Sequence, residues 1–281
     1  MEKLKAIIQL IRPELPLAGG ICVIAGQIIV LQNLPSLYVG LLGFFTGFFI
    51  SSAAMVTNDY FDLDVDKINH PQRPLPSGKI SLSEIKVLTV ILSILGFLTA
   101  AILGPLPLAL SVFLWMVAIL YNWKCKETGL LGNVMVAISV SGFFIFGGLS
   151  VGGLTNGLIW IFGALAFLFD LAEEIAGDSM DMEGDKERSS KTIARTHGKN
   201  YALTVSCTLY SFLVILSVVP FITGWLDLKF LYIFIPLDMA IIYLALKILK
   251  TTTVEEGRKR IRQLFLTMTA FVVVFVALLL L

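Results

Sequence analysis

The sequence predicts an all-α, polytopic membrane protein, a bundle of nine transmembrane helices in which one carboxylate motif occurs twice. Its 281 residues are 57% hydrophobic and 15% charged, whereas ordinary soluble domains carry about 25% charged residues. Apolar stretches recur along the whole chain, and each crossing of a membrane needs about 20 residues. Nine crossings leave little chain for anything else, so we expect a single transmembrane domain over residues 1–281.

The expected helices are apolar stretches bounded by proline, glycine or charged residues. The start of the chain is amphipathic up to Arg12-Pro13 and lacks a short apolar core followed by a small-residue cleavage site. We therefore expect the first apolar stretch to remain in the protein rather than to be removed as part of a signal peptide. The nine stretches cover residues 16–33, 36–57, 82–102, 105–122, 130–150, 155–176, 201–223, 228–249 and 261–281.

Basic residues mark one side of the membrane. All of the 21 Lys and Arg residues except Lys229 lie in alternate connections between the expected helices. Because cytoplasmic loops are enriched in Lys and Arg, we expect a multi-pass protein of the cell membrane with a cytoplasmic N-terminus and an outside C-terminus. Membrane lipids are the expected surroundings. The net charge of +1 gives no indication of a nucleic-acid partner, none is expected, and the oligomeric state stays unknown.

The motif D-x-x-D-x-x-x-D occurs at the expected cytoplasmic ends of the second and sixth helices. The two copies begin 119 positions apart, at Asp59 and Asp178. On an α-helix, positions i, i+3 and i+7 fall within about 60° of one another, so each copy is expected to form one stripe. The same period adds Glu174 to the second stripe and turns Asp64 away from the first. The residues of interest are Asn58, Asp59, Asp62 and Asp66 in the first copy, and Glu174, Asp178, Asp181 and Asp185 in the second.

Carboxylates gathered on one stripe repel one another unless a cation neutralises them. A run of acids is usually a solvated helix face, but carboxylates at a membrane boundary are costly and generally face a protein interior or an aqueous cavity. Oxygen ligands without His or Cys favour Mg²⁺, which binds through one or two carboxylates together with substrate phosphates. We therefore expect both stripes to hold Mg²⁺ at one diphosphate. All the residues of interest are candidate metal ligands, and all except Glu174 are candidate catalytic residues.

Basic residues follow both motifs closely. Arg suits bidentate capture of phosphate oxygens, and Lys supplies a compact charge. The segment 69–79 contains three prolines and a glycine, so it is expected to be a loop that could close over a diphosphate. The alternative is that these cations only set the membrane topology. The candidate substrate-binding residues are Lys67, Arg73 and Lys79 after the first motif, and Arg188 and Lys191 after the second.

Both motifs resemble signatures of a known family. The segment 58–66, N-D-x-x-D-x-x-x-D, resembles the first signature of the UbiA superfamily of prenyltransferases, and the segment 178–185 resembles the second. The opening Arg12-Pro13, the loop 73–80 and the stretch 184–194 are similar as well. The resemblance covers the whole chain and implies a bundle of nine helices.

One segment departs from the family pattern. After the fourth helix, many members have a Tyr and, four positions later, a basic residue. Here Tyr121 is followed by Lys124 and Lys126, at three and five positions, so which lysine meets the diphosphate stays open. By resemblance, Tyr121 joins the candidate catalytic residues, and Arg12, Lys124 and Lys126 join the candidate substrate-binding residues.

The resemblance implies a Mg²⁺-dependent prenyl transfer near the cytoplasmic face, at loops of about 58–81, 121–129 and 177–199. Within the superfamily, the inner loops look most like an archaeal branch. Its members transfer geranylgeranyl from its diphosphate to the hydroxyl of geranylgeranylglyceryl phosphate, giving digeranylgeranylglyceryl phosphate and pyrophosphate in ether-lipid synthesis. The acceptor hydroxyl must lose a proton, and Asn58, Tyr121 or a metal-free carboxylate could help.

Two other functions stay open. One is prenyl transfer to an aromatic or macrocyclic acceptor, such as a quinone precursor or a chlorophyllide-like molecule, because a related branch has a similar loop 73–78. The other is a cation-coupled membrane transporter, since intramembrane acids and internal repeats also occur in transporters. Release of pyrophosphate that needs both Mg²⁺ and an acceptor would separate the enzyme from the transporter.

Overall fold

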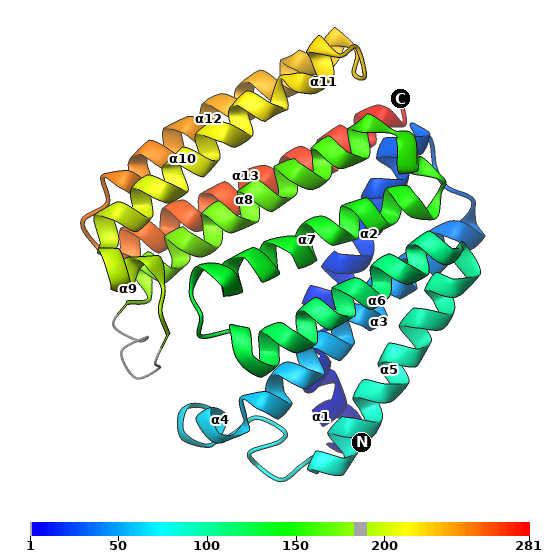
Figure 1. Cartoon of the computed structure of the whole chain (residues 1–281), viewed down its shortest axis with the longest axis vertical. Coiled ribbons are helices and arrows are strands. Elements are labelled where there is room, and N and C mark those ends of the chain that lie inside the picture. Colours follow the sequence, from blue (N-terminus) through cyan, green and yellow to red (C-terminus); the bar gives the residue numbers. More distant parts are fainter. Residues whose placement is uncertain (1, 183–189) are drawn as a thin grey trace. The chain divides into compact units, whose positions relative to one another are not determined.

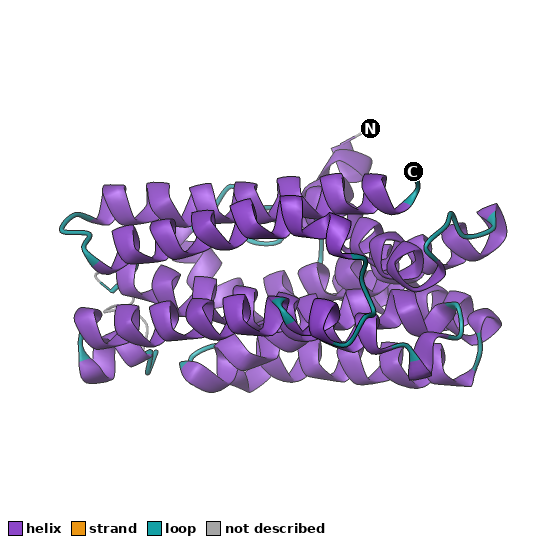
Figure 2. Cartoon of the chain, turned by 90° about the horizontal axis from the view of Figure 1, so that it is seen from above, coloured by secondary structure: helices purple, strands orange, loops and turns teal. Residues whose placement is uncertain are grey.

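The protein is described here by a computed structural model that covers residues 2–182 and 190–281. Every regular element of these residues is a helix, as Figures 1 and 2 show, so the predicted all-α class is confirmed. Backbone contacts divide the chain into two compact units. Unit 1 is Met1–Trp123 with Gly142–Leu154, and unit 2 is Lys124–Ser141 with Thr155–Leu281. The single domain expected over the whole chain stays a prediction.

Unit 1 contains the first carboxylate motif. A short helix, α1, lies before the first long apolar helix, and a second short helix, α4, follows the motif (Figure 1). A π-helical turn, Tyr121–Cys125, follows the last full helix of the unit. The helices are α1 (Glu2–Ile11), α2 (Glu14–Leu31), α3 (Leu37–Phe61), α4 (Leu63–Asn69), α5 (Leu82–Leu103), α6 (Pro105–Leu120) and the second part of α7 (Leu130–Ser150).

Small residues let the helices of unit 1 approach closely. A Cβ atom on Gly43 or Gly47 of α3 would meet the side chain of Val23 on α2. A Cβ on Gly147 of α7 would clash with the carbonyl oxygen of Val23. Such contacts are how membrane helices pack without a hydrophobic driving force between them. Helix α3, whose end carries the motif, is therefore packed tightly against its neighbour α2.

Unit 2 contains the second carboxylate motif, at the end of α8. Four long helices, α8, α10, α12 and α13, lie side by side in it (Figure 1) and share one buried core that includes Tyr210, Ile241 and Leu264. The helices are the first part of α7, α8 (Gly157–Met180), α9 (Ile193–His197), α10 (Lys199–Ser217), α11 (Val219–Ile222), α12 (Leu231–Leu249) and α13 (Val254–Leu279).

Helix α13 begins earlier than the sequence predicted. The expected span started at residue 261, but the helix starts at Val254, so the charged segment before the span is helical. Thr253 caps this end, because its hydroxyl oxygen accepts a hydrogen bond of 3.2 Å from the backbone N–H of Glu256. A Cβ on Gly257 would clash with Met180, so the first turns of α13 lie directly against the end of α8.

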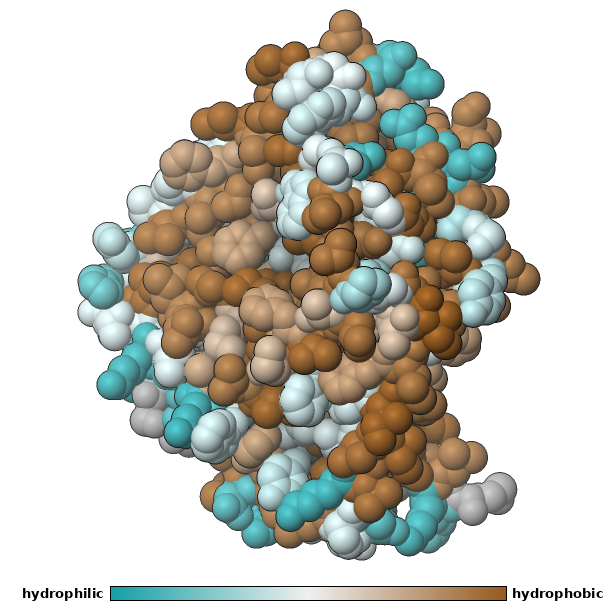
Figure 3. Space-filling model, turned by 45° about the vertical axis from the view of Figure 1, so that its right-hand side comes forward, coloured by the Kyte–Doolittle hydropathy of each residue, from teal (hydrophilic) through white to brown (hydrophobic). Residues whose placement is uncertain are grey.

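Within the described part of the chain, eight helices are long and apolar enough to cross a membrane. The remaining expected span, 155–176, falls on α8, which carries Asp170, Glu173 and Glu174, so the count of nine stays a prediction. Many large apolar side chains are exposed, among them Leu37 and Ile222, and hydrophobic residues cover most of the face in Figure 3. An exposed apolar surface of this extent is what a lipid-embedded bundle requires.

Candidate functional site

The first motif lies where one helix ends and another begins. Helix α3 ends at Phe61, and Asp62 is its C-cap with φ −85° and ψ 2°. Asp66 lies on the separate helix α4. The prediction that Asp59, Asp62 and Asp66 form a stripe on one continuous helix is therefore wrong. The backbone conformation of Asp62 interrupts the helix although the amide of Asp66 still bonds to the carbonyl of Asp62 at 2.8 Å.

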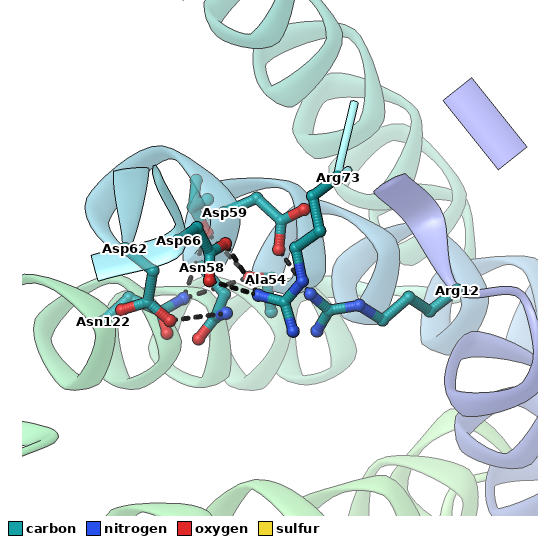
Figure 4. Close-up of polar contacts among 9 residues, drawn as sticks. Arg12, Ala54, Asn58, Asp59, Asp62, Asp66, Arg73 and Asn122 are labelled. Carbon is teal, nitrogen blue, oxygen red and sulfur yellow. Dashed lines mark hydrogen bonds and ion pairs between the residues drawn. The ribbon is translucent and has the colours of Figure 1, made fainter. Parts of the chain in front are cut away.

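Two arginines neutralise the buried carboxylates of this motif (Figure 4). Nη2 of Arg12 lies 2.5 Å from Oδ1 of Asp59, whose side chain is 2% exposed. Nη1 of Arg73 lies 2.7 Å from both carboxylate oxygens of Asp66. A buried carboxylate is costly unless it is paired. The structure therefore brings together four residues that the sequence singled out, Asp59, Asp66, Arg12 and Arg73.

Two amides complete the cluster. Nδ2 of Asn58 donates to Oδ2 of Asp62 at 3.1 Å. From the π-helical turn, Nδ2 of Asn122 donates to the carbonyl oxygen of Ala54 at 3.0 Å and to the hydroxyl of Thr57 at 3.2 Å. Asn122 therefore connects the end of α6 to the last turns of α3. π-Helical turns occur frequently at functional sites, but nothing in the local sequence identified Asn122.

The second motif repeats the local geometry of the first. Helix α8 ends at Met180, and Asp181 is its C-cap with φ −103° and ψ 7°, close to the values at Asp62. Glu174 and Asp178 both lie on α8, as the predicted stripe requires. Asp181 lies just beyond the end of this helix, so the stripe does not continue as one helix. Asp185 lies outside the described residues.

A cavity of about 380 Å³ opens beside this motif. Glu174, Asp178 and Asp181 line it together, as the sequence predicted. Two further acids that the prediction did not place in the cluster line it too: Asp170 and Glu173, which lie eight and five positions before Asp178 on α8. The rest of the wall is Gly177 of α8 and Ile261 and Phe265 of α13.

Partners from distant segments contact the second motif. Nδ2 of Asn133 on α7 donates to Oδ2 of Asp178 at 2.9 Å. Nη2 of Arg258 on α13 lies 2.5 Å from Oδ1 of Asp181. The sequence prediction assigned neither residue to the site, since the two partners are separated by 45 and 77 positions respectively.

The other predicted substrate-binding cations differ in how far they are exposed. Lys67 pairs at 2.9 Å with Asp64, which is 93% exposed, so the prediction that Asp64 points away from the stripe is confirmed. Lys79, Lys124 and Lys191 are exposed. Lys126 and Tyr121 are half-buried, and Arg188 lies outside the described residues. Their roles stay predictions.

The donors of both motifs suit a hard cation. Within residues 2–182 and 190–281, no three His, Cys, Asp or Glu side chains are grouped as a complete set of metal ligands. Mg²⁺ does not need such a set, because it keeps several waters and binds through one or two carboxylates plus substrate phosphates. The carboxylate and amide oxygens around Asp62 and around Asp178 and Asp181 therefore fit Mg²⁺ that arrives with a diphosphate.

The chain is similar to known proteins along nearly its whole length. The sequence profile of the UbiA prenyltransferase family matches residues 20–269. The digeranylgeranylglyceryl phosphate synthase of Thermococcus kodakarensis is 31% identical over 270 residues, which cover 96% of this chain and 95% of that protein. A solved structure of a digeranylgeranylglyceryl phosphate synthase has a TM-score of 0.88 at 31% identity and covers 99% of this chain and 98% of its own. A UbiA homologue from Archaeoglobus fulgidus, bound to GPP and Mg²⁺, shares the fold with a TM-score of 0.71 at 19% identity, over 95% of this chain and 97% of its own.

Proposed function

This chain belongs to the UbiA prenyltransferase family, and from that membership we propose a specific reaction for it. The protein transfers a geranylgeranyl group from geranylgeranyl diphosphate to the free hydroxyl of geranylgeranylglyceryl phosphate. The products are digeranylgeranylglyceryl phosphate and pyrophosphate. The observation that carries the proposal is the 31% identity, over 96% of this chain, to a relative named digeranylgeranylglyceryl phosphate synthase.

In this reaction the allylic C–O bond to the diphosphate breaks, and a new ether C–O bond forms to the acceptor oxygen. The acceptor hydroxyl loses its proton, and pyrophosphate leaves. Asn58, Asp62, Glu174, Asp178 and Asp181 are the residues that would hold Mg²⁺. Asp59 and Asp66, which the sequence also predicted as ligands, pair instead with Arg12 and Arg73, and Asp185 stays a predicted ligand. Bound Mg²⁺ would neutralise the negative charge that develops on the leaving pyrophosphate.

The remaining site residues would bind the diphosphate or assist the loss of the acceptor hydroxyl proton. The guanidinium groups of Arg12 and Arg73 keep Asp59 and Asp66 in place, and their remaining N–H groups could donate to phosphate oxygens. A carboxylate that holds no metal would take the acceptor proton, and Asn58 or Tyr121 could assist by hydrogen bonding to the acceptor hydroxyl. Charge stabilisation by fixed donors of this kind is usually the largest contribution to catalysis.

The protein is an integral membrane protein with several apolar helices. We assign its N-terminus and the loops that carry both motifs to the cytoplasmic side, because all basic residues except Lys229 lie in the connections on that side. The diphosphate and the acceptor phosphate would then reach the motifs from the cytoplasm.

Product identification tests the proposed reaction. Purified protein in lipid nanodiscs is incubated with geranylgeranyl diphosphate, Mg²⁺ and a panel of acceptors, and the products are identified by mass spectrometry. We expect the diether product from geranylgeranylglyceryl phosphate, and no product when Mg²⁺ is chelated. Preferred transfer to a quinone precursor or a chlorophyllide-like acceptor would replace the acceptor assignment. Absence of any transfer, with a cation flux instead, would favour a transporter.

A further inference from the structure

A second cavity lies between α8 and α13, with a volume of about 310 Å³. It adjoins the acidic cavity beside the second motif, and both share Glu173, Gly177, Asp181, Ile261 and Phe265. The lining differs in charge. The acidic cavity has five carboxylates and no cation, whereas this one has two carboxylates and two arginines, and its residues are Glu173, Gly177, Met180, Asp181, Arg258, Ile261, Arg262 and Phe265.

One face of α13 supplies both the charge and the apolar wall. Arg258, Ile261, Arg262 and Phe265 are spaced i, i+3, i+4 and i+7, the positions that share one face of an α-helix. The two guanidinium groups are therefore one helical turn apart, at the cytoplasmic end that we assigned to this helix. Ile261 and Phe265 continue the same face with apolar surface. The cavity thus combines a cationic end with an apolar wall.

Such a lining suits an amphiphile with a phosphate head and a hydrocarbon chain. Arg is well suited to bind phosphate oxygens in a bidentate manner, and the two guanidinium groups have more N–H donors than the bond to Asp181 uses. The apolar side chains of Met180, Ile261 and Phe265 suit a prenyl chain. The exposed carboxylate of Asp181 does not prevent this, because Arg258 already neutralises it at 2.5 Å.

We propose that Arg258 and Arg262 bind the phosphate group of the acceptor, geranylgeranylglyceryl phosphate, in this cavity. The inference rests on the proposed function and adds the residues that select a phosphorylated acceptor. A guanidinium group has five N–H donors, so Arg258 contacts the phosphate while it keeps its bond to Asp181. The acceptor phosphate then lies one side chain away from a carboxylate of the second motif.

The same two arginines could also bind the phosphate of a membrane phospholipid. The experiment therefore distinguishes the acceptor phosphate from a phospholipid headgroup. The assay compares geranylgeranylglyceryl phosphate with geranylgeranylglycerol, which lacks the phosphate. Both acceptors are tested with wild-type protein, Arg262→Gln, and the double variant Arg258→Gln/Arg262→Gln. Nanodiscs contain either phosphatidylcholine alone or added anionic phosphatidylglycerol. Lys259→Gln is the matched control, since it removes a cation from the same turn of α13 that does not line the cavity.

For the phosphorylated acceptor, kcat/KM should fall about tenfold to a hundredfold in the double variant, the range for loss of charged hydrogen bonds. Arg262→Gln should show part of this loss as a raised KM for that acceptor, while the KM for geranylgeranyl diphosphate stays unchanged. That second KM also reports correct folding. Transfer to geranylgeranylglycerol by Arg262→Gln, which leaves the Arg258–Asp181 pair intact, and the activity of Lys259→Gln should stay at their wild-type values in both kinds of nanodisc.

An unchanged preference of the double variant for the phosphorylated acceptor would overturn the inference. So would an effect seen only with phosphatidylglycerol present, because that result would assign the arginines to lipid headgroups. If the wild-type protein prefers another class of acceptor, the proposed function itself fails. If the wild-type protein uses the phosphorylated acceptor but the variants prefer it over geranylgeranylglycerol to the same degree, only the assignment of Arg258 and Arg262 fails.

Discussion

Nη2 of Arg12 lies 2.5 Å from Oδ1 of Asp59, and the carboxylate is 2% exposed while the arginine is 26% exposed. Arg12 has a φ of 49°, in the left-handed region that non-glycine residues seldom adopt. It lies in the short connection between α1 and α2, where the chain turns before Pro13. The turn thus directs a guanidinium group onto the first carboxylate of the motif at a cost in backbone energy.

Replacement of Arg12 should therefore destabilise the protein as well as impair transfer. Arg12→Gln removes the ion-pair partner of the buried Asp59, and loss of one partner of a buried pair costs about 3 kcal/mol or more. We expect a lower midpoint of thermal unfolding in detergent. The control is Lys3→Gln, which breaks the exposed ion pair of Lys3 with Glu84 and should change the midpoint little. Equal midpoints for the two variants would show that the Arg12 pair does not stabilise the fold.

Asn122 should affect the reaction through the position of α3. Asn122→Ala removes the bonds to Ala54 and Thr57 that connect α6 to the last turns before Asn58. A small displacement of Asn58 and Asp62 should lower kcat between about tenfold and a hundredfold and raise the Mg²⁺ concentration needed for half-maximal activity. Thr128→Ala is the control, because its hydroxyl bonds to the nearby carbonyl of Cys125 in an exposed loop. A wild-type Mg²⁺ dependence in Asn122→Ala would contradict this role.

The packing of unit 1 gives a test that does not depend on catalysis. Gly147→Ala places a Cβ against the carbonyl oxygen of Val23, where backbone cannot move away easily. The expected loss is about 1–3 kcal/mol in the free energy of unfolding, as for other overpacked sites. Gly40→Ala is the matched change, since its Cβ would make ordinary contact with Pro35 at 3.4 Å. Thermal unfolding of both variants should separate them, and a stable Gly147→Ala protein would refute the close approach.

The assigned membrane orientation can be tested by labelling. In a protein whose three native cysteines are replaced by Ser, Lys229→Cys should react with a membrane-impermeant maleimide added outside intact cells. Lys250→Cys should react only after the membrane is permeabilised, because the connection between α12 and α13 is assigned to the cytoplasm. The reverse pattern of labelling would invert the orientation and move both motifs to the outer face.

Much of the fold could be predicted because hydropathy and helix period are local properties of the sequence. The apolar stretches predicted the long helices to within a few residues, apart from the early start of α13. The period of the helix also predicted that Asp64 points away from the first stripe, where it is 93% exposed, and that Glu174, Asp178 and Asp181 lie on one side of the chain, where they line one cavity. The three prolines of segment 69–79 correctly predicted irregular structure there, except that Asn69 ends α4.

Two features could not be predicted because they depend on distant contacts or on small backbone changes. Arg258 reaches Asp181 only because Gly257 allows the start of α13 to lie against Met180. The helix ends at Asp62 although segment 59–66 contains neither glycine nor proline, so its sequence is equally compatible with a continuous helix. Helix propensity is a poor predictor of such helix ends, since tertiary contacts override it.

The central claim is that both carboxylate motifs serve one Mg²⁺-dependent reaction. Pyrophosphate release from geranylgeranyl diphosphate, with geranylgeranylglyceryl phosphate and Mg²⁺, tests it most directly in Asp62→Ala and Asp181→Ala, with Asp64→Ala as the exposed control. We expect pyrophosphate release to fall more than about a hundredfold in each of the first two variants and to stay near the wild-type rate in Asp64→Ala. Full activity in either Asp62→Ala or Asp181→Ala would contradict this claim.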